Sequence, residues 1–312
     1  MSAVAPDYAV GQARAARARF SLDEADFLGA LLVAPAIVFI VALIAVPFFL
    51  ALYYSVSAYN MGNLSFSFVG LENFIEVTKS EIFRQALVNT FIFTFASNAI
   101  ALVLGKITAL VLLREFPGRT LARCLLILPW AVPVALAAIT WRWIFDSQYS
   151  VVNWVLVHTH LVDPSVWPNW LGEETLAMIS IIVIQAWRLF PFSAIIFLAG
   201  LTSVPKAIID ASYIDGAGYW RRTFQIVLPV ILPIMMVALL FGLVFTFTDM
   251  SVVYLVTKGG PTNSTQVLGS LAFQVGILSG NVGRGAAISL YFFPFLLIAT
   301  FFLLRYLRRR EI

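Results

Sequence analysis

Long apolar stretches constrain this chain more than any other feature of its sequence. Residues 28–52 contain no charged side chain, and five later stretches contain at most one each. A helix needs about 20 apolar residues to cross the hydrocarbon core of a bilayer. The composition agrees, because 61% of the 312 residues are hydrophobic and only 12% are charged, about half the charged share of a soluble domain. The sequence therefore predicts an all-α polytopic membrane protein with six transmembrane helices.

The predicted spans are residues 28–52, 86–113, 124–141, 176–204, 223–248 and 285–304. Most of them contain proline. We expect these spans to remain helical, because neighbouring segments can satisfy the backbone groups that a proline frees in a membrane helix. The prolines concerned include Pro35, Pro47, Pro129, Pro133, Pro191 and Pro294.

The basic residues predict the orientation of the spans. With an even number of spans both termini share one side, and most of the 20 Lys and Arg fall on that side or in its loops. Because cytoplasmic loops carry an excess of Lys and Arg, both termini are predicted to be cytoplasmic and the chain to be a multi-pass protein of the cell inner membrane. This asymmetry accounts for the net charge of +4, so no nucleic-acid partner is expected.

Three regions follow from this topology: a cytoplasmic N-terminal segment 1–27, a membrane domain 28–306 and a cytoplasmic tail 307–312. The first apolar run is too long for the core of a cleaved signal peptide, which has about 7–15 residues, so we expect it to be retained. The single cysteine, Cys124, excludes a disulfide within the chain.

One predicted cytoplasmic connection, DASYIDGAGYWRRTFQIVLP at residues 210–229, is charged and broken by glycine. Ser203 and Pro205 are typical of a helix start, and apolar or small residues recur at helical spacing at positions 207, 208, 211 and 214. Gly216 and Gly218 each weaken a helix by about 1 kcal/mol relative to alanine, so they predict a turn.

A second short helix, carrying Trp220, is expected to reach Leu228-Pro229 and run into the fifth span. The product is a helix–turn–helix at residues 203–229, called the elbow below. A tip of small residues allows close approach by another protein, and a flanking aromatic side chain can anchor the contact. An amphipathic loop that rests on lipid headgroups is the other interpretation that these residues allow.

The elbow resembles the EAA loop, E-A-A-x-x-D-G-A-x(8)-I-x-L-P, of permease subunits in ABC importers. The matching residues are Asp210-Ala211-Ser212, Asp215-Gly216-Ala217, Ile226 and Leu228-Pro229. Asp210 replaces the usual Glu, and Ser212 replaces the second Ala. Five further segments resemble the sugar-permease branch typified by maltose and trehalose importers: GLENF (70–74), LVNTFIFT (87–94), ILPWAVP (127–133), WRWIFD (141–146) and TKGGPTNST (257–265).

This resemblance implies an assembly. Two such permeases pair as a heterodimer, two cytoplasmic ABC ATPases contact their elbows, and an extracytoplasmic solute-binding protein delivers the substrate. The implied function is import of a sugar, such as the disaccharides trehalose or maltose or an oligosaccharide, by alternating access. The chain has no phosphate-binding loop of the G-x-x-x-x-G-K-[ST] type. No catalytic residues are therefore expected, and ATP and Mg²⁺ are expected on the partner ATPase.

The resemblance also implies which residues contact the ATPase. It assigns this role to Asp210, Ala211, Asp215, Gly216 and Ala217. The chemistry of the adjacent side chains adds Tyr219, Trp220, Arg221 and Arg222 to the predicted coupling residues.

Polar residues inside the spans or just beyond their ends are candidates for a substrate pathway, because ionisable groups in the membrane usually face an interior or a cavity. The candidates are Asn98, Gln185, Trp187, Arg188, Asp249 and Tyr254. The alternative is that they make structural contacts between helices, including an Arg188–Asp249 pair. Lys106 and Arg142 lie nearer the ends of their spans, where we expect their side chains to reach the interface.

Other functions stay open at this stage. Glycerol 3-phosphate is an alternative substrate, because related permeases carry it and Arg188 could attract phosphate. An ion-coupled secondary transporter is a weaker alternative, because Asp249 is the only acidic residue well inside a span. No metal site is predicted, because the two histidines, His158 and His160, have no further ligands that the sequence identifies.

Overall fold

The computed structural model describes residues 24–62, 66–163 and 165–308, and their regular structure is helical apart from one isolated bridge between Ser57 and Phe68. The helices are α1 (Glu24–Ile40), η1 (Val41–Ala45), α2 (Val46–Ser55), α3 (Glu72–Lys79), α4 (Glu81–Leu113), α5 (Arg119–Ala131), α6 (Val134–Ile144), α7 (Val151–His158), α8 (Glu174–Ser203), α9 (Lys206–Ile214), α10 (Tyr219–Arg221), η2 (Arg222–Val227), α11 (Leu228–Thr248), α12 (Ser251–Val256), α13 (Leu268–Phe273), η3 (Gln274–Leu278), α14 (Val282–Leu290) and α15 (Phe292–Arg308), where η marks a π-helical turn.

The chain divides into two compact units, Met1–Leu50 and Ala51–Ile312. The described part of the first unit consists of α1, η1 and the beginning of α2, which form one continuous apolar helix despite Pro35. The second unit contains all the other helices. Residues 1–23 and 309–312, most of the predicted terminal segments, lie outside the described residues, and the limits of the predicted membrane domain stay a prediction.

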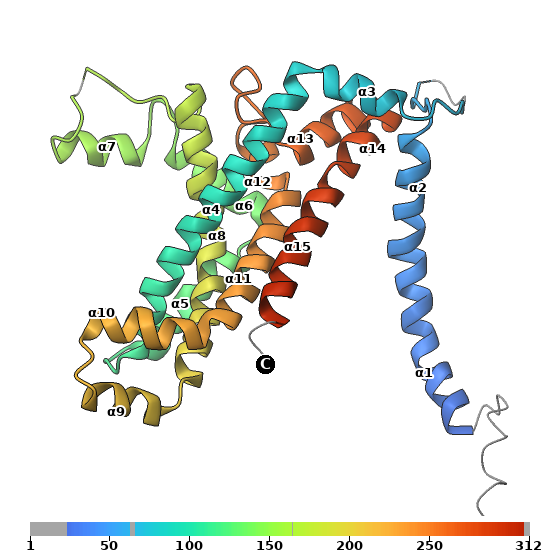
Figure 1. Ribbon diagram of the computed structural model, residues 1–312. Coiled ribbons are helices and arrows are strands. Elements are labelled where there is room, and N and C mark those ends of the chain that lie inside the picture. Colours follow the sequence, from blue (N-terminus) through green and yellow to red (C-terminus); the bar gives the residue numbers. More distant parts are fainter. Residues whose placement is uncertain (1–23, 63–65, 164, 309–312) are drawn as a thin grey trace, which may run out of the picture. The chain divides into compact units, whose positions relative to one another are not determined.

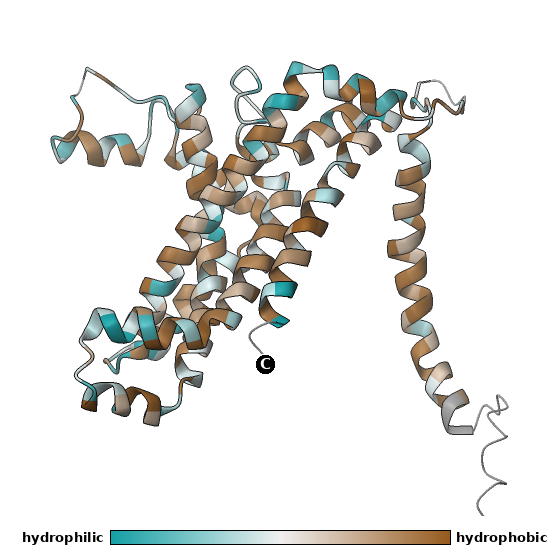
Figure 2. Cartoon of the chain, viewed as in Figure 1, coloured by the Kyte–Doolittle hydropathy of each residue, from teal (hydrophilic) through white to brown (hydrophobic). Residues whose placement is uncertain are grey.

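Five of the six predicted spans are helices long and apolar enough to cross a membrane: Phe27–Ser55, Glu81–Leu113, Glu174–Ser203, Tyr219–Thr248 and Val282–Arg308. Figure 2 shows apolar residues along the middle of the helices, with polar residues gathered at the elbow and at α3. The sequence-based fold class, an all-α polytopic membrane protein, is confirmed.

The third predicted span differs from the expectation of one helix over residues 124–141. It is broken between α5 and α6, which meet at an angle of 94°. Val132 lies at φ −67° and ψ 131°, an extended conformation, because the ring of Pro133 disfavours helical geometry in the residue before it. Pro129 stays inside α5. The pair therefore counts as a sixth span only if both halves are taken together.

Close packing of α4 on α8 forms the centre of the second unit. A Cβ on Gly105 would lie 2.7 Å from Ser193 Cβ and 2.9 Å from the Ala194 backbone nitrogen, so only glycine fits there. Ala101 and Ala109 are also buried on this face of α4. Small residues let membrane helices approach closely, and this contact fixes the two longest helices of the unit.

The two ends of the second unit differ in content. The elbow, the start of α5 and the end of α15 lie at one end, whereas α3, α7 and the loop 257–265 lie at the other (Figure 1). The sequence-based prediction missed helices at the second end, among them α3 and the short apolar helix Leu268–Leu278, which is formed by α13 and η3. Leu268 and Leu271 of this helix are buried against Phe83 and Ile288.

Buried polar side chains hold the loops at this second end through hydrogen bonds to the backbone. Asn89 Nδ2 donates hydrogen bonds to the carbonyls of Ser264 (2.8 Å) and Gln266 (3.0 Å). Thr90 Oγ1 accepts one from the Leu268 backbone N–H (2.9 Å). These two residues belong to the LVNTFIFT segment, so that segment ties α4 to the TKGGPTNST loop. In the GLENF segment Asn73 Nδ2 has the same role toward the carbonyls of Ser55 and Ser57.

Candidate functional site

The Asp-Gly-Ala sequence of the elbow ends α9. The Gly216 N–H donates to the Tyr213 carbonyl (3.1 Å), and the Ala217 N–H donates to the Ser212 carbonyl (3.0 Å). Gly216 lies at φ +68°, which glycine adopts at little cost. These two bonds and the left-handed glycine are those of a Schellman C-cap. The predicted turn is confirmed, and the left-handed backbone at position 216 explains why a glycine stands there.

The second arm of the elbow continues into the membrane helix without a break. Tyr219–Thr248 is one apolar helical span made of α10, η2 and α11, with Pro229 in the first turn of α11. The second helix therefore runs into the fifth span, as expected, and does not end at Leu228-Pro229. Pro229 cannot donate a backbone hydrogen bond within this continuous helix, and the π-helical turn η2, whose hydrogen bonds span one residue more, lies just before it. The elbow and α11 therefore share one continuous helix from Tyr219 onward.

The start of α9 also differs from expectation. Pro205 is the residue before the first turn, whereas Ser203 is the last residue of α8 and its hydroxyl donates to the Gly200 carbonyl (2.8 Å). Ser203 therefore does not cap α9. The extended conformation of Val204 and Pro205 separates the two helices.

The predicted coupling residues differ in accessibility. Trp220 is 71% exposed and Tyr219 is also exposed. Ala217 is only 7% exposed, so its side chain faces the interior of the elbow beside the buried Ser212. Arg222 is half-buried. The other predicted coupling residues are exposed: Asp210, Ala211, Asp215, Gly216 and Arg221.

Two exposed apolar residues at the tip were not among the predicted coupling residues. Ile214 is 87% exposed and Tyr213 is 61% exposed. Sequence periodicity placed position 214 on the apolar face of α9, and the same face includes the exposed Ile208. The apolar stripe of α9 is visible in the sequence, but only the structure shows that it stays exposed. An exposed apolar stripe of this kind is typical of a surface that contacts a partner.

Basic side chains of this region contact aromatic rings. The guanidinium of Arg222 lies 4.1 Å from the centroid of the Tyr213 ring, which bridges the two arms of the elbow. Lys106 Nζ, on α4, lies 4.9 Å from the centroid of the Phe224 ring on η2. Cation–π contacts of this kind contribute about 0.5–1 kcal/mol where exposed. Lys106 therefore links α4 to the elbow.

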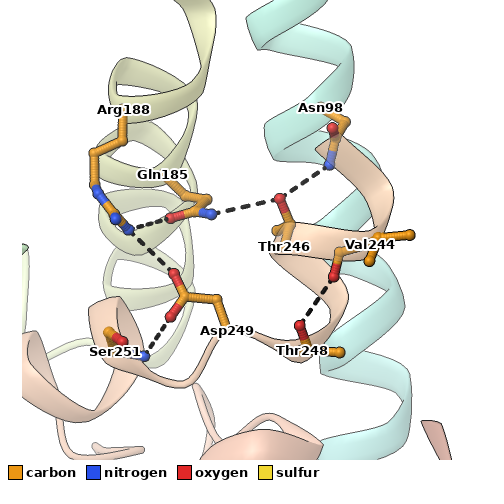
Figure 3. Close-up of polar contacts among 8 residues, drawn as sticks. All are labelled: Asn98, Gln185, Arg188, Val244, Thr246, Thr248, Asp249 and Ser251. Carbon is orange, nitrogen blue, oxygen red and sulfur yellow. Dashed lines mark hydrogen bonds and ion pairs between the residues drawn. The ribbon is translucent and has the colours of Figure 1, made fainter. Parts of the chain in front are cut away.

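A buried chain of hydrogen bonds joins three membrane helices (Figure 3). Asn98 Nδ2 on α4 donates to Thr246 Oγ1 on α11 (3.2 Å), and Gln185 Nε2 on α8 donates to the same oxygen (3.4 Å). Arg188 Nη1 then donates to Gln185 Oε1 (3.1 Å). Thr246, whose hydroxyl accepts from both amides, is the central member of the network. It is not among the six predicted pathway residues, although it lies three residues before Asp249 in the sequence.

The network ends in an ion pair. Arg188 Nη1 lies 3.1 Å from Asp249 Oδ2, and the side chains are 25% and 17% exposed. Asp249 Oδ1 also accepts a hydrogen bond from the Ser251 N–H (2.7 Å), which fixes the carboxylate where α11 ends and α12 begins. The predicted pair is formed. Both side chains also stay partly exposed.

Two predicted pathway residues lie outside this network. Trp187 is half-buried and packs edge-on against Trp141 of α6, with ring centroids 5.5 Å apart. Tyr254 on α12 contacts the Phe273 ring and lines a cavity of about 240 Å³ together with Lys258, Gln266 and Gln274. Within the described ranges no cluster of three His, Cys, Asp or Glu could hold a metal ion.

Comparison with protein families gives a match over residues 97–312 to the binding-protein-dependent transport system inner membrane component. The trehalose/maltose transport system permease protein MalF of Thermococcus litoralis is 34% identical over 78% of this chain and 81% of its own. The sn-glycerol-3-phosphate transport system permease protein UgpA of Agrobacterium fabrum is 30% identical over 90% of this chain and 94% of its own.

The fold is also found in solved structures. A chain of a bacterial ABC transporter involved in the import of the acidic polysaccharide alginate matches with a TM-score of 0.77 at 19% identity, over 91% of this chain and 96% of that one. A chain of the MetNI methionine ABC transporter matches with a TM-score of 0.53 over 74% and 99%. The arrangement of helices is therefore that of an ABC transporter permease. Together with the family match and the identity to known permeases, this makes the chain a member of the binding-protein-dependent transport system inner membrane component family.

Proposed function

We propose that this chain is the membrane subunit of an ATP-driven sugar importer, in which it pairs with a second permease. Two ABC ATPases contact the elbows of the pair from the cytoplasm, and a solute-binding protein delivers the sugar from outside. The observation that carries the proposal is the elbow, because its exposed tip is continuous with α11. In this proposal both termini and the elbow are cytoplasmic, and ATP and Mg²⁺ bind only to the ATPases.

The elbow suits the docking of an ATPase for physical reasons. Its tip is closed by a Schellman cap, so its shape does not depend on a partner. Ile214, Tyr213 and Trp220 give an exposed apolar surface next to the carboxylates of Asp210 and Asp215. Changing a transporter from 1:99 to 99:1 between two states needs about 5.5 kcal/mol of differential binding. Closure of the ATPases provides that energy through α11.

The preferred substrate is a di- or oligosaccharide such as trehalose or maltose. The similarity to MalF, a trehalose/maltose transport system permease protein, supports this class, whereas Asn98, Thr246 and Gln185 are buried and hydrogen-bonded to one another. Glycerol 3-phosphate is the second candidate, supported by the similarity to UgpA. The pairing of Arg188 with Asp249 favours the neutral sugar over glycerol 3-phosphate. The carboxylate of Asp249 already neutralises the positive charge of Arg188 that would otherwise attract a phosphate group.

The experiment that tests the function is transport in reconstituted vesicles. The chain is co-purified with its second permease and the ATPases and supplied with the binding protein, radiolabelled trehalose, maltose or glycerol 3-phosphate, and ATP on the elbow side. We expect sugar uptake that requires ATP. Uptake by the chain alone, driven by an ion gradient, would instead make it a secondary transporter, and uptake of glycerol 3-phosphate alone would correct the substrate.

A further inference from the structure

A cavity of about 240 Å³ lies between the elbow and the membrane helices α4, α8 and α11. Leu110 and Leu113 of α4, Phe197 and Leu201 of α8, and Ile231 of α11 form much of its wall. Apolar walls of this kind are covered most favourably by an apolar group. The elbow closes one side of the cavity through Ile209, Tyr219 and Thr223.

Two cations line the same cavity, Lys106 from α4 and Arg222 from η2. Neither has a carboxylate oxygen within 4.0 Å in the part of the chain that the structure describes. Each contacts an aromatic ring instead, Lys106 that of Phe224 and Arg222 that of Tyr213. Among the described residues, the positive charge beside this apolar space therefore has no anionic partner.

These properties specify the chemistry of the occupant. A small hydrophilic anion would match the cations but leave the apolar wall unfilled. A neutral hydrocarbon would fill the wall but leave the two charges uncompensated. An amphiphile with an acyl chain and an anionic headgroup satisfies both, and a membrane supplies acidic phospholipids of this kind to basic pockets at the ends of its helices.

We propose that this cavity binds an acyl chain of an acidic phospholipid from the leaflet on the elbow side, with the lipid phosphate held by Lys106 and Arg222. The bound lipid joins α4 to the elbow and so supports the elbow against the membrane helices. This goes beyond the proposed transport function and requires only that the apolar helices cross a bilayer. It holds whether or not an ATPase contacts the tip.

The test is a titration of the full-length chain in detergent with dioleoylphosphatidylglycerol, followed by native mass spectrometry, with dioleoylphosphatidylcholine as the neutral probe. We expect tighter binding of the anionic lipid. Because one Lys or Arg near an anionic lipid contributes about fivefold in affinity, Lys106→Gln and Arg222→Gln should each weaken binding about fivefold and the double variant about thirtyfold.

Three further variants separate the cavity from general surface charge. Arg221→Gln is the matched control, because Arg221 does not line the cavity and its Nε donates to Gln225 Oε1 (3.2 Å); binding should be unchanged. Arg222→Lys keeps the charge and should retain binding. Leu110→Trp keeps both cations but fills the space, so it should weaken binding at least fivefold.

Several outcomes would overturn the proposal. Equal affinity for the two lipids would remove the role of the cations, and full binding by Leu110→Trp would remove the role of the cavity. An equal loss in Arg221→Gln and Arg222→Gln would indicate diffuse attraction to basic residues. If Arg222→Gln lost the ATPase in co-purification while it still bound phosphatidylglycerol normally, Arg222 would belong to the docking surface instead.

Discussion

Gly242 and Asn98 are in direct contact where α11 crosses α4. Asn98 Nδ2 donates to the Gly242 carbonyl (3.3 Å), and a Cβ on Gly242 would collide with Asn98 Oδ1. The same amide group donates to Thr246 Oγ1. The absence of a side chain at position 242 therefore allows both the close crossing and the buried polar network.

A methyl group at this position should be destabilising. Gly242→Ala overpacks the crossing and displaces the Asn98 amide, which should cost about 1–3 kcal/mol. Gly29→Ala is the matched control, because Gly29 lies in α1 with open space where a Cβ would be placed, so it should be neutral or gain about 1 kcal/mol in helix propensity. Thermal unfolding in detergent measures both. Equal melting temperatures for the two variants would contradict the packing argument.

Substitution of Gly216 should uncouple transport. Gly216 is at φ +68° with open space around it, whereas Gly218 has equally open space at φ −61°. A β-branched residue is strained only at the first position. Gly216→Val should therefore distort the tip and abolish ATP-dependent uptake, while Gly218→Val keeps the fold of the elbow. Uptake is compared at equal membrane abundance, and normal transport by Gly216→Val would argue against the elbow as the coupling element.

Ile214, which is 87% exposed at the tip of the elbow, should contribute to the affinity of the ATPase. Ile214→Asp places a charge at the centre of the exposed apolar tip, so co-purification of the ATPase should fall at least tenfold, as for loss of an apolar anchor worth about 1.4 kcal/mol or more. Leu161→Asp is the control, since Leu161 is a 73% exposed apolar residue in the connection after α7. A loss of ATPase in both variants would mean that general insertion, rather than docking, is affected.

Variants of Arg188 and Asp249 can show whether this ion pair only stabilises the fold or also takes part in transport. Asp249→Leu leaves Arg188 partly buried without its partner and should lower stability by about 1–3 kcal/mol. The double variant Arg188→Met, Asp249→Leu removes both charges and should regain that stability. If the pair also lines the pathway, as the sequence suggests, the double variant should remain deficient in sugar uptake because both polar groups are lost. Full uptake by a stable double variant would show that the pair is only structural.

Asn153 should hold the loop 150–171 together. It is fully buried, donates to the Pro168 carbonyl (2.9 Å) and accepts from Trp170 Nε1 (2.6 Å), and its N–H donates to the Ser150 hydroxyl (3.1 Å). Asn153→Ala leaves buried polar groups unpaired, at about 1–3 kcal/mol. Faster hydrogen exchange in this loop should result. Asn169→Ala, at an exposed position, is the control, and equal exchange in the two variants would contradict this role.

The sequence predicted the fold well where a single physical rule decides the structure. Apolar length identified five spans because crossing hydrocarbon requires about 20 such residues. It failed at Pro133, where the rule that membrane helices tolerate proline competed with the steric effect of proline on Val132. It also missed Leu268–Leu278, because this helix is too short for a span and is held by tertiary contacts with Phe83 and Ile288.

The candidate site was predicted in part. The pairing of Arg188 with Asp249 was one of two alternatives, because residues 61 apart in sequence meet only once α8 and α11 are packed. The Gly216 turn followed from local chemistry. Exposure could not be derived locally, so Ile214 was not singled out and Ala217 was treated as a contact residue although its side chain is buried.

The π-helical turn η2 has a consequence for the geometry of the elbow. A turn of this kind contains one residue more than an α-helical turn, and each residue of a helix rotates the chain by about 100°. The direction in which Trp220 points is therefore set by that one additional residue between Trp220 and α11. Loss of a single amino acid from Arg222–Val227 would turn the tip by more than a quarter of a circle around the helix axis, while changing the length of the arm by only about 1.5 Å.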